Sequence, residues 1–175
     1  MENKLTVDIN SYLVFKIGDE EFAANAGKVQ RILELQPITK VPKSQVYMKG
    51  VINLMGKVLP VIDARLKMGM PEKEADNNTC IIVLEIKKGL KHVETGIIVD
   101  SVQSVIEIQQ EEISAPPSLG VEVNTDFIRG MVEKDNKFIM LLDVDNVFSV
   151  EEVISIKDAV ENHDETIEQG QIVEK

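Results

Sequence analysis

The stretch that decides the fold is MKGVINLMGKVLPVID, residues 48–63, because its pattern recurs 80 positions later as IRGMVEKDNKFIMLLD, residues 128–143. Each copy reads as an apolar residue, a basic residue and a glycine, then a strand, a turn, a second strand and an aspartate. Apolar segments on either side of a short turn are typical of a β-hairpin. The glycine and the aspartate lie 13 residues apart in both copies, so the sequence predicts two equivalent hairpins.

The repeat extends upstream of the hairpins, where Val29-Gln30 matches Val102-Gln103 at an offset of 73. Around these motifs the pattern predicts further strands at residues 12–17, 22–24, 33–40, 80–86 and 93–99, and a strand or short helix at 102–108. Short helices are expected at residues 25–31, 64–68 and 144–148, after the capping residues Asn25, Asp63 and Asp143. Each half then has roughly five short strands, which close best as a small barrel.

Composition supports a mostly β fold, because 22 Val and 20 Ile outnumber 12 Leu and 7 Ala. The expected organisation is a disordered N-terminus at residues 1–10, one barrel at about 11–75 and a second at about 79–150. The pattern leaves open whether terminal strands cross from one half into the other barrel. Residues 151–175 carry eight acids and two lysines, which predicts an acidic tail with a docked helix to about Val160 and a mobile remainder.

The net charge of −11 disfavours nucleic acid and anionic membranes as partners, because phosphate-rich surfaces repel an acidic protein. A single cysteine, Cys80, gives no internal disulfide. The N-terminus has no apolar signal-peptide core, and no apolar run is long enough to span a membrane. We therefore expect a cytoplasmic protein without direct membrane insertion.

No catalytic or cofactor motif is present. His92, His163 and Cys80 have no metal-ligand spacing, and a calcium loop starting at Asp143 would need Gly at 148 and Glu at 154. Nucleotide-binding and nucleophile motifs are also missing. The sequence predicts no enzyme, no cofactor and no metal, and leaves protein contact as the function. Val29, Val102 and Val105 lie either beside a groove between the barrels or in the core.

The motifs along residues 11–150 resemble the CheW-like family of chemotaxis coupling proteins, in the same order and with the same spacing. The resemblance implies two pseudo-symmetric, five-stranded SH3-like barrels packed together, with a few short helices. The segments that carry it are Tyr12–Phe22, Lys28–Gln30, Lys49–Leu54, Gly56, Val58–Asp63, Arg65, Gly96–Asp100, Val102, Val105, Pro116 and Gly130.

The resemblance implies an adaptor that performs no chemistry and needs no cofactor. Such adaptors join the cytoplasmic tips of methyl-accepting chemoreceptors to the regulatory domain of the CheA-type histidine kinase, so the chain would reach membrane receptor arrays through its partners. The valines would line receptor-facing or seam surface, the glycines would be turn or close-packing positions, and Asn53 would shape the hairpin. The implied partner-binding residues are Val29, Gly50, Asn53, Leu54, Gly56, Arg65, Gly96, Val102, Val105 and Gly130.

Two residues depart from the family pattern near the implied receptor surface. The family commonly has Glu where this chain has Arg31, and Arg where it has Met55. Keeping Arg opposite Arg31 would bring like charges together, so the two departures are mutually consistent. They lead to the hypothesis that the chain serves a divergent chemosensory pathway with altered receptor recognition.

Three alternatives agree less well with the sequence. A CheV-like protein would carry a receiver domain after residue 150, and the 25 residues there are far too few, so we expect no full CheV. An RNA-binding small barrel would need basic grooves and stacking aromatics, which the composition does not supply. An enzyme would need a pocket with perturbed carboxylates.

Overall fold

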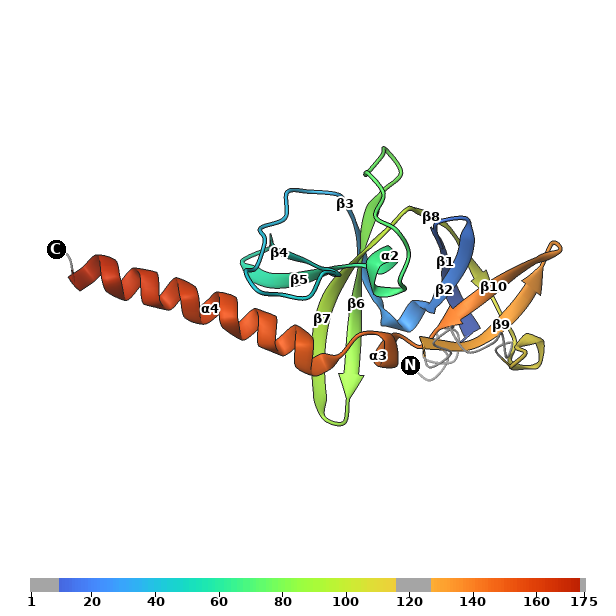
Figure 1. Cartoon of the computed structure of the whole chain (residues 1–175). Helices are drawn as coiled ribbons and strands as arrows, with labels where there is room; N and C mark the ends of the chain where they lie inside the picture. Colours follow the sequence, from blue (N-terminus) through green and yellow to red (C-terminus); the bar gives the residue numbers. More distant parts are fainter. Residues whose placement is uncertain (1–9, 116–126, 174–175) are drawn as a thin grey trace.

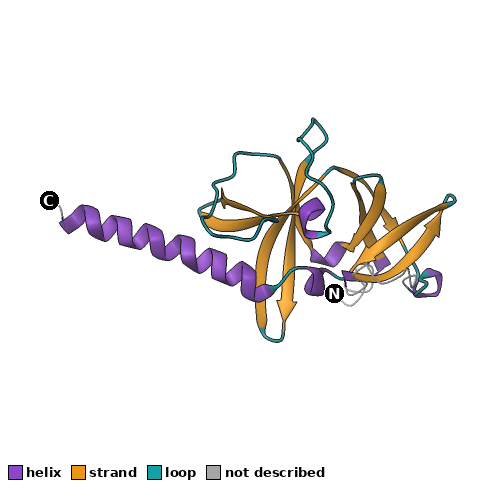
Figure 2. Cartoon of the chain, viewed as in Figure 1, coloured by secondary structure: helices purple, strands orange, loops and turns teal. Residues whose placement is uncertain are grey.

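The protein is mostly β-structure, with two five-stranded sheets and few short helices, as the sequence predicts (Figures 1 and 2). The computed structural model describes residues 10–115 and 127–173. Most of the expected disordered N-terminus, residues 1–9, and the family position Pro116 lie outside the described residues. Among the described residues, no helix combines the length and the apolar character needed to cross a membrane.

Each sheet takes strands from both halves of the chain. The first sheet has the order β8-β1-β2-β10-β9 and the second has β3-β6-β7-β5-β4. The N-terminal hairpin β1–β2 therefore lies with the C-terminal strands, so the sheets do not follow a contiguous boundary near residues 75–79. The strands are β1 (Ser11–Ile17), β2 (Glu20–Asn25), β3 (Val29–Glu34), β4 (Met48–Leu54), β5 (Lys57–Asp63), β6 (Cys80–Lys88), β7 (Lys91–Val99), β8 (Ser101–Glu107), β9 (Ile128–Lys134) and β10 (Lys137–Leu142).

The two sheets repeat the same topology strand by strand. Each has one parallel pair, β10 with β2 and β5 with β7, and every other pair is antiparallel. The register repeats too, because Val102 lies opposite Phe15 as Val29 lies opposite Leu84. The pseudo-symmetry inferred from the offsets of 73 and 80 is thus present in the backbone. We call the unit built on β3–β7 barrel B and the unit built on β8, β1, β2, β10 and β9 barrel A.

At the apolar-basic-glycine motif, the strand pairing shifts by one residue, and the backbone of another segment then passes close to the strand. The β4–β5 pairing skips Lys49 and the β9–β10 pairing skips Arg129, as in a β-bulge. Two residues after each skipped residue, the strand forms an isolated bridge with another segment. Val51 pairs with Thr39, in the segment after β3, and Met131 pairs with Ser114, in the segment after β8. These bridges bring the last strand of each sheet back to the continuation of its first strand, which closes both barrels.

One hydrophobic core joins the barrels, and each barrel has a smaller core of its own. On β1, Leu13, Phe15 and Ile17 enter the shared core, while Tyr12 and Val14 enter the interior of barrel A. On β6, the shared core takes Ile82, Leu84 and Ile86, while barrel B takes Ile81 and Val83. Successive side chains point to opposite faces of a strand, so β1 and β6 are buried on both faces.

Two local predictions differ from the structure, and one open alternative is decided by it. The helix expected to reach Arg31 is a single 3-10 turn, η1 (Ala26–Lys28), because Val29 already pairs with β6. The strand expected to reach Lys40 ends at Glu34. The segment 102–108, left open as strand or helix, forms β8 at Ser101–Glu107.

The capping aspartates differ in their contacts. Asp63 accepts hydrogen bonds from the backbone N–H groups of Arg65 and Leu66 and caps α2 (Ala64–Lys67), as expected. Asp143 precedes α3 (Val144–Val147), but its carboxylate accepts instead from the side-chain amide of Asn146 at 2.7 Å. A second 3-10 turn, η2, spans Gln110–Glu112.

The C-terminal helix is longer than the sequence predicts. α4 runs over Val150–Val173 rather than ending near Val160, and it projects away from the barrels (Figure 1). Its start is anchored, because Val150 and Val153 lie in the shared core and Glu152 Oε1 accepts a hydrogen bond of 2.7 Å from the Tyr47 hydroxyl. Burial, together with this hydrogen bond, raises the pKa of Tyr47 to about 12.

We expect Gly50→Ala to destabilise the protein by about 2–4 kcal/mol, since its Cβ would overlap the carbonyl oxygen of Thr39 at the barrel closure. Gly56→Ala is the matched control: φ is positive there as well, at +84° against +143° at Gly50, but the added Cβ meets open space. That control should cost only about 1–2 kcal/mol from backbone strain. Urea unfolding measures the free energy of unfolding of both variants. Equal losses of stability would contradict the close approach of Gly50 to Thr39.

Candidate protein-binding surfaces

The partner-binding residues inferred from the sequence divide into buried and accessible positions. Gly50, Gly96 and Gly130 are buried, so no partner reaches them directly. A Cβ at Gly96 would lie 2.8 Å from Ile81 Cγ2, and one at Gly130 would lie 2.8 Å from the Ser114 carbonyl oxygen. These three glycines are close-packing positions that shape the barrels.

The three valines occupy different environments. Val29 and Val102 are half-buried and pack against the shared core, at equivalent places on the two barrels. Val105 is 62% exposed on β8. Its equivalent at an offset of 73 is Ile32, which is 47% exposed on β3. Sequence reasoning missed Ile32, although the same offset that matched the Val-Gln pairs points to it.

The turn between β4 and β5 is fixed by Asn53 and presents Met55. Asn53 Oδ1 accepts a hydrogen bond of 2.8 Å from the Gly56 N–H. Met55 has φ +51° and is 74% exposed, while Leu54 is half-buried. A positive φ is costly for a long unbranched side chain, and water contact with so much apolar surface is costly as well. The turn requires the positive φ, because Asp135 has φ +51° at the equivalent place in barrel A, but it does not require an exposed apolar side chain there.

The two departures from the family pattern touch one another. Arg31 Nη1 lies 3.8 Å from Met55 Sδ, so the β4–β5 turn contacts β3 through this pair. Among the described residues Arg31 forms no ion pair with a carboxylate. We call Arg31, Ile32 and Met55 the β3 surface. It offers an exposed cation in contact with the exposed Met55, and an exposed Ile32 at the next position of the same edge strand.

The equivalent place on barrel A is built differently. Offsets of 73 and 80 relate Arg31 to Ser104 and Met55 to Asp135. Instead of a side-chain contact, a pocket of about 400 Å³ lies there, lined by both residues together with charged side chains such as Glu107 and Lys137. The β3 surface is therefore not a requirement of the shared fold.

Arg65 links the two barrels. Its Nη1 lies 2.5 Å from Asp100 Oδ2, and the same oxygen accepts a hydrogen bond of 2.6 Å from the Gly18 N–H. Both charged side chains are largely buried, at 16% and 15% exposed. Since Gly18 belongs to the β1–β2 turn of barrel A and Arg65 to α2 beside barrel B, this cluster fastens one barrel to the other.

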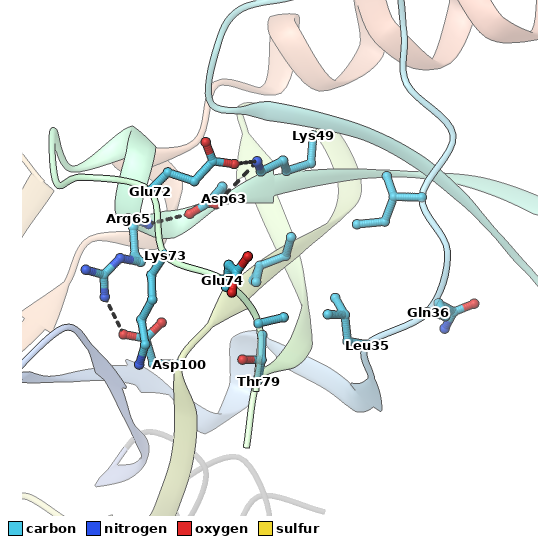
Figure 3. Close-up of a pocket in the computed structure, with 13 residues that line it drawn as sticks. Leu35, Gln36, Lys49, Asp63, Arg65, Glu72, Lys73, Glu74, Thr79 and Asp100 are labelled. Carbon is cyan, nitrogen blue, oxygen red and sulfur yellow. Dashed lines mark hydrogen bonds and ion pairs between the residues drawn. The ribbon is translucent and has the colours of Figure 1, made fainter. Parts of the chain in front are cut away.

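A pocket of about 300 Å³ lies under the loop of residues 71–79, and several of its charged groups are paired (Figure 3). Lys49 Nζ lies 2.6 Å from Glu72 Oε1 and 3.9 Å from Asp63 Oδ2, and the Lys49 ammonium lowers the pKa of Glu72. Arg65 Nε donates to the Pro71 carbonyl oxygen. These contacts hold the loop in place.

Within residues 10–115 and 127–173, no three His, Cys, Asp or Glu side chains gather where they could hold a metal ion. Cys80 is partly buried, and burial raises the pKa of its thiol. The β3 surface and Val105 are accessible candidates for contact with another protein.

Comparison with known proteins agrees with this architecture. A family model described as "CheW-like domain" matches residues 11–152. The chemotaxis protein CheW of Bacillus subtilis is 35% identical over 140 residues, covering 79% of this chain and 86% of its own. That of Klebsiella aerogenes is 30% identical over 152 residues, covering 87% and 89%.

A solved structure shares the fold. The crystal structure of the scaffolding protein TtCheW from Thermoanaerobacter tengcongensis superposes with a TM-score of 0.72 at 29% identity. The match covers 82% of this chain and 94% of that one. The family model ends at residue 152, so most of α4 lies beyond it.

Arg65→Ala is expected to destabilise the protein by about 2–4 kcal/mol, because it leaves the largely buried Asp100 carboxylate without its cation. Arg129→Ala, at an exposed bulge position, should change stability by less than about 0.5 kcal/mol. Urea unfolding gives both values. If Arg65 acted only as a contact for a partner, its removal would leave the stability unchanged.

Proposed function

The chain belongs to the CheW-like family, and from that premise we propose that it couples chemoreceptor cytoplasmic tips to the regulatory domain of a CheA-type histidine kinase. It is a coupling scaffold of a chemotaxis signalling array and not an enzyme. Its mechanism is assembly, in which contacts that differ between receptor states shift the active fraction of the kinase. Neither nucleic acid nor direct membrane insertion is part of this proposal.

The observation that carries the proposal is the β3 surface. Its apolar side chains are exposed, and Met55 places a long apolar side chain at a positive-φ turn position where barrel A has Asp135. Costs of this kind persist where a surface is kept for binding. Asn53, Leu54 and Gly56 hold the turn that presents Met55, and Val29 and the buried glycines support the barrel behind it.

The β3 surface also favours a divergent partner over the family's usual receptor contact. An unpaired Arg31 beside Met55 suits a receptor segment that offers a carboxylate next to an apolar side chain. We propose that the receptors of this adaptor carry such a pair. Val105 on barrel A and Val102 behind it are the candidates for a second contact, because they occupy the equivalent edge.

We expect this protein to bind the isolated regulatory domain of the CheA-type kinase of its own organism with micromolar or tighter affinity. Calorimetric titration at moderate salt measures the affinity. An absence of binding to every CheA-type kinase of that organism would mean that the fold serves another partner.

Reverting both departures, Arg31→Glu with Met55→Arg, should weaken binding to the cognate receptor tips about tenfold, or about 1.4 kcal/mol. The matched control places the same residues on barrel A, as Ser104→Glu with Asp135→Arg. Pull-down of receptor cytoplasmic fragments over a concentration series compares the two variants. Unchanged or tighter binding by the reverted protein would refute altered receptor recognition.

A further inference from the structure

Two ion-pair clusters occupy equivalent places on the two barrels, with their charges exchanged. In the cluster that joins the barrels, the cation is Arg65 of α2 and the acid is Asp100, directly before β8 (Figure 3). An offset of 80 relates Arg65 to Asp145 of α3. Asp145 Oδ2 lies 2.9 Å from Nζ of Lys28, directly before β3. We call the first group the β8 cluster and the second the β3 cluster.

Each cluster also accepts a hydrogen bond from the backbone of barrel A or barrel B, but through different segments. In the β8 cluster, Asp100 itself accepts from the Gly18 N–H that follows β1. In the β3 cluster, the acceptor is Asp145 of α3, which takes the Lys87 N–H of β6 at 2.9 Å. The segment before β8 is thus bound directly to its neighbour. The segment before β3 is bound through the flexible side chain of Lys28, which contacts α3.

The backbone and the solvent exposure of the two clusters differ in the same direction. The Asp100 N–H donates 2.9 Å to the carbonyl oxygen of Lys16 on β1. Gly27, the equivalent of Asp100 at an offset of 73, donates its N–H to Asn25 Oδ1 within its own turn. The two charged side chains of the β3 cluster are 25% and 35% exposed, against 16% and 15% in the β8 cluster. The start of β3 is therefore held less firmly than the start of β8.

The first residues of β3 lie at the edge of their sheet and pair irregularly. β3 stands at the end of the strand order, next to β6. The pairing joins Val29 to β6, skips Gln30 and resumes at Arg31. The Gln30 side chain donates to Glu85 Oε2 at 3.2 Å in an exposed contact. Segments with exposed hydrogen bonds and few buried contacts open locally at low free energy.

We propose that the β3 cluster is a salt-sensitive fastening, and that its opening frees residues 29–31 from β6 while the two barrels stay packed. Added salt screens an exposed ion pair more than a buried one, so the β3 cluster opens before the β8 cluster. Arg31 lies at the end of the freed stretch, so opening separates its guanidinium from Met55 Sδ. A partner that recognises the β3 surface therefore selects the closed form. The fastening itself does not depend on the kinase and receptor contacts.

Amide hydrogen exchange, followed residue by residue by NMR in the full chain, measures the opening. At about 0.1 M salt, Lys28→Gln should accelerate exchange at residues 29–31 about fivefold, the scale expected for losing an exposed ion pair. Raising the salt to about 1 M shortens the screening length from about 10 Å to about 3 Å. This change should accelerate exchange similarly in the unaltered protein and little in Lys28→Gln. Lys28→Arg, which keeps the charge, should retain slow exchange.

Two comparisons separate the fastening from a general loss of stability. Lys49→Gln is the matched control, because it removes a lysine that is 30% exposed and pairs with Glu72 at 2.6 Å. It should leave exchange at residues 29–31 unchanged. Residues 101–103, at the start of β8, should keep their rates in Lys28→Gln. Unchanged exchange at 29–31 in Lys28→Gln, or equal acceleration at 101–103, would overturn the proposal.

The methyl signal of Met55 tests whether the fastening controls the β3 surface. In protein with isotope-labelled methionine methyl groups, Arg31→Ala gives the position of this signal without the Arg31–Met55 contact. Lys28→Gln should move the Met55 signal toward that position, and Lys49→Gln should leave it in place. Faster exchange at residues 29–31 with an unmoved Met55 signal would refute the link between the fastening and the β3 surface.

Discussion

The fold depends on the burial of β1 and β6 on both faces. One face of each strand fills its own barrel, and the other face, with Phe15 and Leu84 at its centre, fills the core between the barrels. Burying one such side chain stabilises the fold by about 1.5–3 kcal/mol. Each of the two strands contributes three such side chains to the shared core. Their burial amounts to a large part of a typical domain's stability of about 5–15 kcal/mol. Neither barrel would be stable with that face in water, so the two barrels form one rigid unit.

The repeat supplies an internal reference for separating fold from function. Features that occur in both halves, such as the skipped basic residue and the glycine beyond it, belong to barrel closure. Features that occur in only one half need another cause. Met55 stands where the second half has Asp135, and Leu90 stands where the first hairpin has Asp19. Aspartate suits a tight turn, whereas the exposed methionine and leucine do not. Both departures place apolar surface in water at the edge of barrel B.

The sequence predicted the elements whose signal is local and repeated. Both 16-residue hairpins, the strand pairs around residues 80–99 and the cap at Asp63 follow from alternation, turn residues and spacing. Exchange of β1–β2 could not be predicted, because pairing between distant strands leaves no local pattern. The end of α4 was missed because acidic composition suggested a mobile tail. Ile32 was overlooked although the offset to Val105 identifies it, and the Arg31–Met55 contact was anticipated only through the family pattern.

A scaffold built from two similar barrels must bind each partner at one barrel and not at the other. If the β3 and β8 edges were alike, a partner that fits one would fit the other with similar affinity, and the order of an assembly would not be defined. The structure breaks this equivalence at the residues that touch solvent: Arg31 and Met55 close the gap on one barrel, while Ser104 and Asp135 line an open pocket on the other. A carboxylate that pairs with Arg31 finds Ser104 in place of the guanidinium at the equivalent position of barrel A. Specificity of this kind comes from a matching group on one barrel alone, and it requires no change in the shared core.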